Sequence, residues 1–338
     1  MKNIKNVFGG VYFVSSAIIL IPSLFVFTCQ YAYSAQETYT KSVSKDIPFS
    51  NSSTSGQTKK SPGMLSISAP VAGNENAIPA GPESFASDDA GNVYICDTLG
   101  HGIQVYSPRG VFLKNIQLDP AIVPADIAVD KAGNIYIFDD VDGMIYQYDA
   151  SGVLLSNLKF DLTRIEGARG PLHIAGARLY VSDDQQRDVL IGKVVNTVLA
   201  PLTKEELSAP LVPGINAPSG RRYYVELQNY DIGSVKIINS AGIVTKEVSI
   251  PAQKLLSIAF LKEDKNGNFY VQTERSAGGK VLLEMYKFDS GGNYLAKINF
   301  TDTDYSFWSI KLMSVDDNEN VYQFVPTQQK AILNIFRK

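Results

Sequence analysis

Short alternating runs of apolar and polar residues recur along this chain, each introduced by a turn that contains Gly or Asn. The run Asp89–Ile95 has close counterparts at Lys131–Ile137, Lys265–Val271 and Asp317–Tyr322. Gly and Asn tolerate the positive φ of a tight hairpin, and β-branched and aromatic residues favour strands. A strand-and-turn unit that recurs about every 42 to 52 residues is typical of a β-propeller blade.

Six blades of four antiparallel strands can be placed along the chain. The first has strands at residues 84–87, 93–96, 103–106 and 111–117, and the second repeats this arrangement from Pro124 to Lys159. We expect the other four at residues 172–200, 222–250, 256–300 and 309–336. A seventh blade would have to lie between Lys193 and Ser219, where four prolines favour a loop instead.

The sixth blade contains only three predicted strands before the chain stops. Propellers avoid an open edge when one terminus completes the last blade. The alternating segment Met64–Ser68 has no partner of its own, so we predict that it pairs with Ala331–Phe336. The expected fold is therefore all-β: a six-bladed β-propeller over residues 64–338, whose last blade is closed by the N-terminal strand Met64–Ser68.

The N-terminal segment has the order of a secretory signal. Lys2 and Lys5 precede the uncharged stretch Val7–Thr28, and small residues follow at Ala32–Ala35. Residues 1–35 are thus predicted to be a signal peptide or an N-terminal membrane anchor, because an uncharged stretch of this length can also span a bilayer. We expect an exported protein of the periplasm, cell surface or extracellular space, held at the inner membrane by residues 7–28 if the segment is not cleaved.

Residues 36–63 are rich in Ser, Thr, Lys, Gln and Asn, which predicts a disordered polar spacer. Removal of the preceding segment would take away Lys2 and Lys5 and no acid, so the net charge would change from −3 to −5. This acidic balance argues against a nucleic-acid partner. Cys96 would be the only remaining cysteine, which excludes an internal disulfide. We expect a monomeric propeller.

The first blade resembles the NHL repeat. The resemblance rests on Gly81–Ala86, Asp89–Tyr94 and His101–Tyr106, and the second blade keeps Pro124–Asp130. Gly100 and Gly102 depart from the residues usual in that repeat. The resemblance implies a six-bladed propeller. It does not select a function, because the family includes RNA binders, extracytoplasmic sensor domains, peptide-processing lyases and relatives of lactonases.

Polar residues gather in the loops between the second and third strands of the blades, which share one face of a propeller. We expect a binding face there, formed by Asp97, His101, Asp139, Asp140, Asp142, Asp183, Asp184, Arg187, Asn229, Glu274 and Arg275. Aspartates in this arrangement can bind a basic partner or a hard cation such as Ca²⁺. They can equally accept hydrogen bonds from turn N–H groups. Beyond Ca²⁺ no cofactor is predicted.

No catalytic constellation is evident in the sequence. Zinc-dependent lyase chemistry needs several converging histidines, and the chain has only His101 and His173. Glu83 follows Gly-Pro, where the lactonase-like pattern has the glutamate first. The sequence favours a non-catalytic propeller of the cell envelope that binds a ligand or scaffolds a protein, peptide or glycan. The alternative is a metal-dependent hydrolase or lyase that acts at the central channel.

Overall fold

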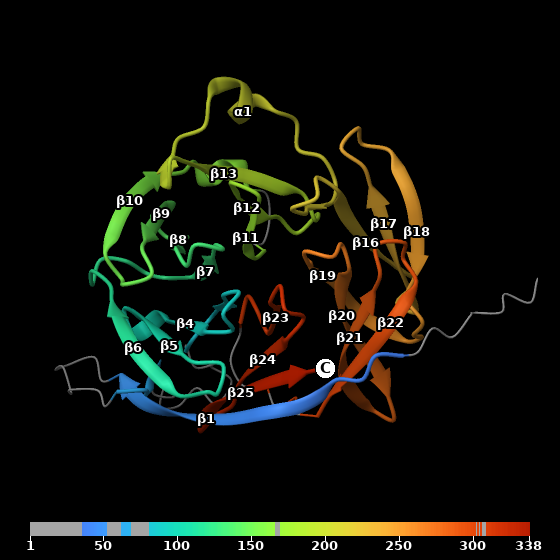
Figure 1. Cartoon of the computed structure of the whole chain (residues 1–338), viewed down its shortest axis with the longest axis horizontal. Coiled ribbons are helices and arrows are strands. Elements are labelled where there is room, and N and C mark those ends of the chain that lie inside the picture. The colour runs from blue at the N-terminus through green and yellow to red at the C-terminus, as the bar shows by residue number, and fades with distance from the viewer. Residues whose placement is uncertain are drawn as a thin grey trace, which may run out of the picture. The chain divides into compact units, whose positions relative to one another are not determined.

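The computed structural model describes residues 36–52, 62–68, 81–165, 170–301, 303, 305 and 309–338, which all belong to one compact unit. Its strands form six small sheets arranged around a central axis, and all strand pairs are antiparallel except one pair at the outer edge of the last sheet (Figure 1). The sheets follow one another in chain order around the ring, and the first strand of each lies nearest the axis. The protein is a six-bladed β-propeller, as the repeat predicts.

The blades are numbered in chain order, from the inner strand outwards. Blade one contains β3 (Phe85–Ser87), β4 (Val93–Asp97), β5 (Gly102–Tyr106) and β6 (Phe112–Gln117); blade two contains β7 (Asp126–Val129), β8 (Ile135–Asp139), β9 (Met144–Tyr148) and β10 (Leu154–Lys159). Blade three contains β11 (Leu172–Ala175), β12 (Arg178–Ser182), β13 (Asp188–Val195) and β14 (Val198–Ala200).

The second half of the ring repeats this order. Blade four contains β15 (Ile215–Asn216), β16 (Arg222–Gln228), β17 (Ile232–Ile238) and β18 (Val244–Ser249); blade five contains β19 (Leu255–Glu263), β20 (Phe269–Ala277), β21 (Lys280–Phe288) and β22 (Tyr294–Phe300). Blade six contains β23 (Met313–Val315), β24 (Val321–Pro326) and β25 (Lys330–Arg337), completed by β1 (Thr40–Ser52) and β2 (Leu65–Ser68).

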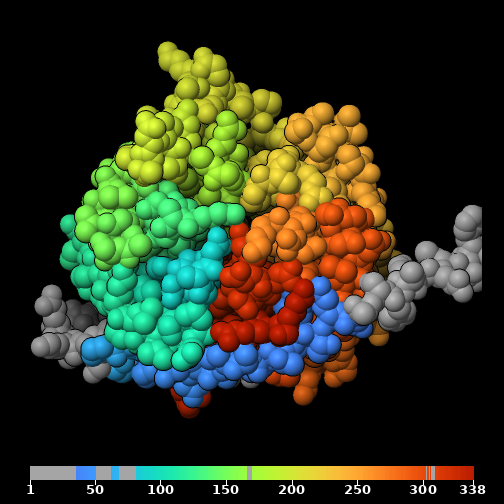
Figure 2. Space-filling model, viewed as in Figure 1, coloured from blue at the N-terminus to red at the C-terminus, as the bar shows by residue number. Residues whose placement is uncertain are grey.

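The ring closes through an N-terminal strand, but through a different one from the strand predicted. β1 pairs antiparallel with β25, with Ile47 opposite Ala331. β2, which contains most of the predicted closing segment Met64–Ser68, pairs parallel with the outer side of β1 and does not pair with β25. In Figure 2 the blue band of β1 runs along the red strands of blade six. The predicted pairing of Met64–Ser68 with Ala331–Phe336 was therefore wrong.

The predicted spacer over residues 36–63 was also wrong for the part that the structure describes, because thirteen of its residues form β1. Ile47 is fully buried and packs in one cluster with Leu65, Leu333 and Ala331. At the start of the segment, Glu37 lies 2.6 Å from the fully buried ammonium of Lys287, which also contacts Glu319 at 2.9 Å. The propeller domain thus begins well before residue 64. Residues 53–61 lie outside the described part of the chain.

The recurring Asn-x-Tyr sequence folds into one hydrogen-bonded unit that begins at an aspartate four residues before the Asn; the residue before the Asn is Gly in three copies and Glu319 in the fourth. In blade one, Asp88 accepts hydrogen bonds from the backbone N–H and the side-chain amide of Asn92, both at 2.8 Å, and from the Tyr94 hydroxyl at 3.0 Å. The same contacts recur around Asp130, Asp264 and Asp316. Each aspartate closes the turn between the two inner strands and fixes the aromatic side chain that follows.

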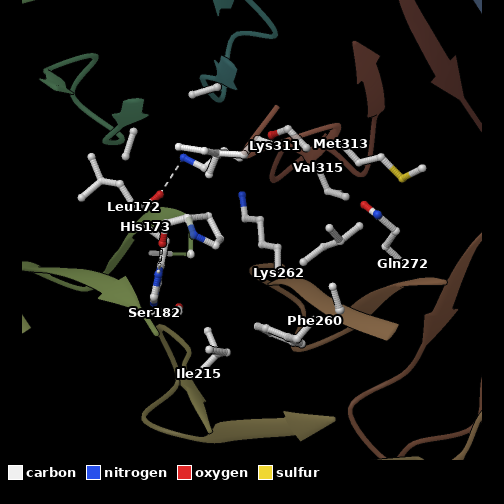
Figure 3. Close-up of a pocket in the computed structure, with 18 of the residues that line it drawn as sticks. Leu172, His173, Ser182, Ile215, Phe260, Lys262, Gln272, Lys311, Met313 and Val315 are labelled. Carbon is white, nitrogen blue, oxygen red and sulfur yellow. Dashed lines mark hydrogen bonds between the residues drawn. The ribbon is translucent and has the colours of Figure 1, made fainter. Parts of the chain in front are cut away.

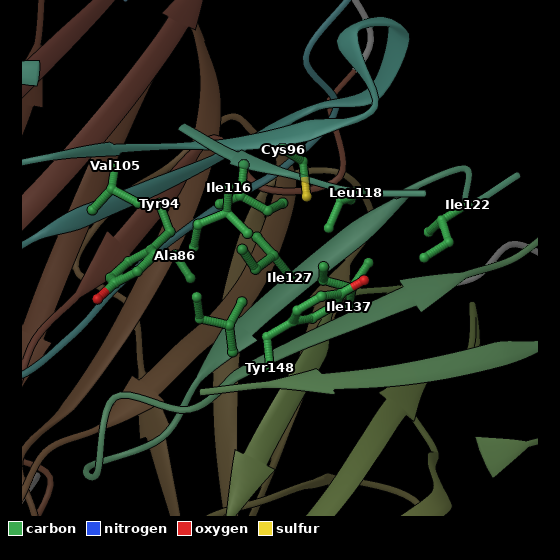
Figure 4. Packing of buried hydrophobic residues seen from close by; sticks show 12 residues of the cluster. Ala86, Tyr94, Cys96, Val105, Ile116, Leu118, Ile122, Ile127, Ile137 and Tyr148 are labelled. Atoms are coloured by element: carbon green, nitrogen blue, oxygen red, sulfur yellow. The ribbon is translucent and has the colours of Figure 1, made fainter. Parts of the chain in front are cut away.

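Apolar side chains fill the space between neighbouring blades. Ile116 and Leu118 at the outer strand of blade one pack against Ile127, Ile137 and Tyr148 of blade two (Figure 4). Similar clusters join the other blades, so the core lies between the sheets and not at the axis.

A loop links blades three and four, where the prolines predicted one, and no seventh blade lies there. It carries the short helix α1 (Lys204–Ser208), whose capping box joins Thr203 and Glu206. Two further single turns are 3₁₀ helices, η1 (Thr98–Gly100) and η2 (Leu162–Arg164). In the described part of the chain, no helix is both long and apolar enough to cross a membrane.

Candidate functional site

The inner strands of all six blades surround a central cavity of about 580 Å³. This volume is within the range of about 300–1,000 Å³ that is usual for small-molecule sites. Close packing between blades leaves the axis unfilled, because each inner strand turns its edge toward the centre. The cavity wall is mixed: apolar side chains alternate with a few polar and charged ones (Figure 3).

Lys311 reaches across the channel from the segment that precedes β23. Its ammonium lies 2.8 Å from Asp126 Oδ1 of blade two and 2.7 Å from the Leu172 carbonyl oxygen of blade three, and it also donates to the Ile127 carbonyl. These three acceptors use all three N–H groups of the ammonium. Lys311 therefore links blade six to two blades that are not its neighbours in the ring.

His173 on β11 forms the second charged contact of the wall. Its Nε2 lies 3.0 Å from Asp188 Oδ2, and its ring stacks on Tyr180 with ring centroids 5.5 Å apart. Asp188 also accepts hydrogen bonds from the Ser182 hydroxyl and from the side chain of Asn216. Burial opposes a charge on the imidazole, but the Asp188 carboxylate outweighs it and raises the pKa of His173 above its ordinary value.

Lys262 on β19 forms the third contact, near the other end of the inner strands. Its ammonium lies 2.7 Å from Asp317 Oδ1, while Lys131 lies 3.0 Å from Oδ2 of the same carboxylate. Burial acts to raise the pKa of Asp317, yet the two ammonium groups lower it overall. Lys262 lines the cavity, whereas the side chain of Lys131 is 73% exposed and lies outside it.

These three ion pairs share one orientation. In each, the carboxylate is the buried partner: the side chains of Asp126, Asp188 and Asp317 are 1%, 1% and 9% exposed. The cations Lys311, His173 and Lys262 are 14%, 22% and 31% exposed. At these three contacts the cavity wall therefore presents positive charge and hydrogen-bond donors, with the compensating negative charge behind them.

The remainder of the wall is largely apolar. Ile258 and Phe260 of β19 and Leu312 beside β23 are half-buried and line the cavity. Phe260 is held in place by stacking on Tyr223, with ring centroids 4.5 Å apart. Gln272 of β20 also lines the cavity, and among the described residues its side-chain amide has no hydrogen-bond partner. Figure 3 shows Lys262, Gln272 and Phe260 bordering the same space.

Of the residues predicted to form a binding face, Asp183 and Asp184 line the cavity. Asp183 is buried and accepts hydrogen bonds from the Arg187 backbone at 2.8 Å and from its guanidinium at 2.6 Å. Asp184 is exposed. Asp139 is fully buried and accepts from the backbone N–H of Val123 at 2.9 Å. The interpretation that these aspartates satisfy turn N–H groups is confirmed for Asp139 and Asp183.

The other predicted residues do not line the cavity. Asp97 is buried and accepts from the Ser66 backbone at 2.8 Å, so it anchors β2. His101 adopts a left-handed turn conformation, and its Nδ1 lies 3.0 Å from the Ile122 carbonyl oxygen. Asp142 and Asn229 are exposed, while Asp140 is half-buried.

Glu274 and Arg275 lie on β20 in blade five and each make a local contact. The Ser257 hydroxyl donates to Glu274 at 2.9 Å, and the Arg275 guanidinium donates to Glu284 at 2.8 Å. Both contacts join adjacent strands of one sheet. The two side chains therefore have partners within their own blade.

The predicted Ca²⁺ stays a prediction, and the acidic groups that could bind it have the following arrangement. In the described residues, no group of three or more His, Cys, Asp or Glu side chains is arranged to hold a metal ion. The buried channel carboxylates are already engaged by Lys311, His173 and Lys262. Glu83, at the start of blade one, has a raised pKa because of burial and the nearby charges of Asp140 and Asp126.

Sequence reasoning missed Lys262, Gln272 and Lys311. Lys262 follows two apolar residues in a strand, and a lysine in an inner strand is unusual unless it is paired. This was the available signal. Lys311 lies outside any strand, and its role depends on contacts 139 and 184 residues away in the chain.

Several solved structures are similar to this chain at low sequence identity. No family model matches the chain, and no curated protein sequence matches it, so the NHL resemblance stays a prediction. Among solved structures, hydrazine synthase from Kuenenia stuttgartiensis is 13% identical, covering 76% of this chain and 80% of that chain with a TM-score of 0.43. Virginiamycin B lyase from Staphylococcus aureus is 11% identical, covering 76% and 95% with a TM-score of 0.43.

A member of the DUF4221 family from Bacteroides vulgatus is 9% identical, covering 76% of this chain and 92% of that chain with a TM-score of 0.44. These neighbours include a lyase and a protein from a family without an assigned activity. At such identities and scores they carry no argument about the activity of this chain.

Proposed function

We propose that this chain is a ligand-binding propeller that takes its ligand in the central channel. The observation that carries the proposal is the orientation of the three channel ion pairs, in which the buried carboxylates turn Lys262, Lys311 and His173 toward one cavity. A wall that is mostly apolar, with a few convergent polar groups, has the composition of a small-molecule site. The proposed role is binding without catalysis.

The experiment blocks the channel without touching the ion pairs. Ala259 on β19 lines the cavity and is exposed within it, so Ala259→Trp fills the space. Ala241 lies in an exposed outer turn away from the cavity, and Ala241→Trp is the matched control. The purified chain and both variants are incubated with a small-molecule extract of envelope material, and retained compounds are identified by mass spectrometry.

We expect a compound that the unaltered chain and Ala241→Trp retain and Ala259→Trp does not. Equal retention by all three proteins, or no retained compound, would overturn the proposal. Thermal unfolding of each variant shows whether Ala259→Trp has kept the fold.

A second candidate function, binding of a protein partner, is favoured by exposed apolar side chains of blades four and five, at or near the ends of their strands. Tyr230 and Ile232 are 78% and 50% exposed, and Leu256 and Val281 are 41% and 51% exposed. The Leu255 backbone donates to the Asp231 carbonyl, which brings these parts of the two blades together. Contiguous exposed apolar surface is a common mark of protein interfaces.

This candidate is tested by Tyr230→Ser combined with Val281→Ser, using covalent cross-linking in envelope preparations. Loss of a cross-linked species that the Ala259→Trp variant retains would favour this apolar surface as the interface. Unchanged cross-linking would exclude it.

We further propose that the protein acts outside the cytoplasm, because Lys2, Lys5 and the uncharged stretch to Thr28 have the order of an export signal. That segment lies outside the described residues. N-terminal sequencing of the protein from fractionated cells tests both export and cleavage: a mature start near Gln36 in the envelope fraction supports it, and a full-length cytoplasmic protein contradicts it.

A further inference from the structure

The hydrogen-bond donors of the channel that are not used within the protein indicate which kind of ligand the channel binds. The three N–H groups of Lys311 are used by Asp126 and two backbone carbonyls. The ammonium of Lys262 has Asp317 as its ion-pair partner, which leaves it N–H groups to donate. The Gln272 amide has no partner among the described residues, and β19 and β20 place it opposite Ala259 in the same cavity wall.

The free groups near Lys262 therefore include its ammonium, which can only donate, and the Gln272 amide, which can donate as well as accept. A ligand atom that satisfies Lys262 and Gln272 together has to be an acceptor, and an anionic acceptor forms hydrogen bonds roughly twice as strong as a neutral one. A cationic group placed beside Lys262 would meet an ammonium whose carboxylate partner, Asp317, lies behind it. Elsewhere in the cavity wall the exposed carboxylate of Asp184 is present, so the preference for an anionic head group is confined to the part of the wall near Lys262.

The adjoining wall requires an apolar body. Ile258, Phe260 and Leu312 are half-buried at the cavity and have no polar atom to offer a ligand. Displacement of water from such a surface is worth about 25 cal/mol for each Å² buried. A small inorganic anion would leave this surface wet and would gain none of that free energy.

We propose that the channel binds an amphipathic organic anion, whose acidic head accepts hydrogen bonds from Lys262 and Gln272 and whose apolar body packs against Phe260 and its neighbours. This inference rests on the proposed channel-binding function and names its ligand class. It assigns Lys262 and Gln272 as binding residues and Lys311 and His173 as the source of the surrounding positive charge.

The test varies the head group on one apolar body. Binding of octanoate, 1-octanol and octylammonium to the purified full chain is measured by calorimetry, with sodium sulfate as an anion without an apolar body. Octanoate is expected to bind at one site per chain and more tightly than the other three. Lys262→Met should weaken octanoate binding about ten- to hundredfold, the range for losing a hydrogen bond to a charged group, and leave 1-octanol unchanged.

Lys131→Met is the matched control. Lys131 pairs with the other oxygen of Asp317 but lies outside the cavity, so its loss removes a similar ion pair without removing a channel donor. Its octanoate affinity should stay within a factor of two or so of the unaltered chain, as expected for an exposed pair. Gln272→Met supplies a second, independent variant if Lys262→Met does not fold.

The outcomes separate this inference from the proposed function. If octanoate, 1-octanol and octylammonium bind equally and Ala259→Trp abolishes all three, the channel is a binding site but the anion class is wrong. Sulfate binding as tight as octanoate binding would remove the apolar part of the proposal. If none of the probes binds, the ligand class is overturned, while retention of an extract compound that depends on an open channel still supports the proposed function.

Discussion

The ammonium of Lys311 lies 2.8 Å from the carboxylate of Asp126, although blade one separates the two blades that carry them. Asp126 is 1% exposed and also accepts hydrogen bonds from the Ser84 hydroxyl of blade one and the Leu172 backbone of blade three. A single carboxylate thus collects donors from blades one, three and six as well as its own. This contact joins the first half of the ring to its last blade through the axis, independently of the outer closure by β1.

Lys311→Met should destabilise the protein by about 3 kcal/mol, because removing one partner of a buried ion pair leaves the other charge uncompensated. We place the loss at the low end of the usual range since Asp126 keeps three other donors, including its neighbour's N–H at 2.7 Å. Urea unfolding measures the change. Lys330→Met is the control, because its pair with Asp46 is exposed on both sides and should contribute about 1 kcal/mol or less.

The double variant Lys311→Met, Asp126→Asn separates the pair from its surroundings. If the two groups stabilise each other, the double variant loses less stability than the sum of the single changes. Additive losses would show that Lys311 and Asp126 act separately, in contradiction to the cross-ring contact.

The strand-and-turn units could be predicted from sequence because their information is local. Asn92 and Tyr94 recur at fixed spacing, and the turn they form is closed by Asp88, four residues before Asn92. Residues close together in the chain satisfy one another's hydrogen-bonding groups, so the pattern can be recognised without the rest of the chain. The number of blades follows from counting these units.

The closing strand could not be predicted in the same way. β1 is the outer part of blade six, and its exposed face carries the Ser and Lys residues that a spacer would have. Its buried face rests on a few positions such as Val43 and Ile47. A polar strand of this kind is stabilised by the edge it covers, and that edge, β25, is formed almost 300 residues later in the chain. The channel cations were missed for a similar reason: Lys311 meets its partners only once the ring is closed.

The contact between His173 and Asp188 predicts a pH-dependent contribution to stability. Burial disfavours the charged ring and nearby Lys311 opposes it, but Asp188 raises the pKa of His173 above its unfolded value of about 6.5. A raised pKa means that the contribution is fully present below about pH 6.5 and is lost as the pH rises through the folded-state pKa. The pKa of Asp188 is lowered, so its own contribution is lost only in acid, as the pH falls through that lowered pKa.

The measurement compares the free energy of unfolding of the unaltered chain and His173→Gln from pH 5 to pH 9. The difference between the two should be largest at the acid end of this range and should shrink toward neutral and alkaline pH. His101→Gln is the control, because the His101 ring contacts the Ile122 carbonyl and not a carboxylate. A difference that stays constant with pH, or grows as the pH rises, would contradict the assignment.

The repeated aspartate turn predicts that removing the hydroxyl of its tyrosine lowers the free energy of unfolding. The Tyr322 hydroxyl donates to Asp316 at 2.7 Å and the side chain is 1% exposed. Tyr322→Phe should lower the free energy of unfolding by about 1.5–3 kcal/mol, the usual contribution of a hydrogen bond to a charged group. Tyr230, 78% exposed, provides the matched change: Tyr230→Phe should alter stability by less than about 0.5 kcal/mol. Equal effects of the two substitutions would show that the turn bond adds nothing.

The pairing of β1 with β25 makes Ile47 a core residue, although it lies in a segment rich in Ser and Lys. Ile47 is fully buried and sits opposite Ala331 at the junction of the first and last strands. Ile47→Ala should destabilise the protein by about 2–5 kcal/mol, because it leaves a cavity between β1, β2 and β25.

Urea unfolding of the full chain measures this loss, and Ile243→Ala, at a position 61% exposed, is the matched control with an expected change below about 0.5 kcal/mol. Limited proteolysis gives a second readout that does not depend on global stability. Loosening of β1 should make cleavage at Lys41 and Lys45 faster in Ile47→Ala than in Ile243→Ala, because both lysines are on the strand that the isoleucine anchors. If residues 40–52 were a free spacer, Ile47→Ala would be neutral and both lysines would be cleaved equally fast in every variant.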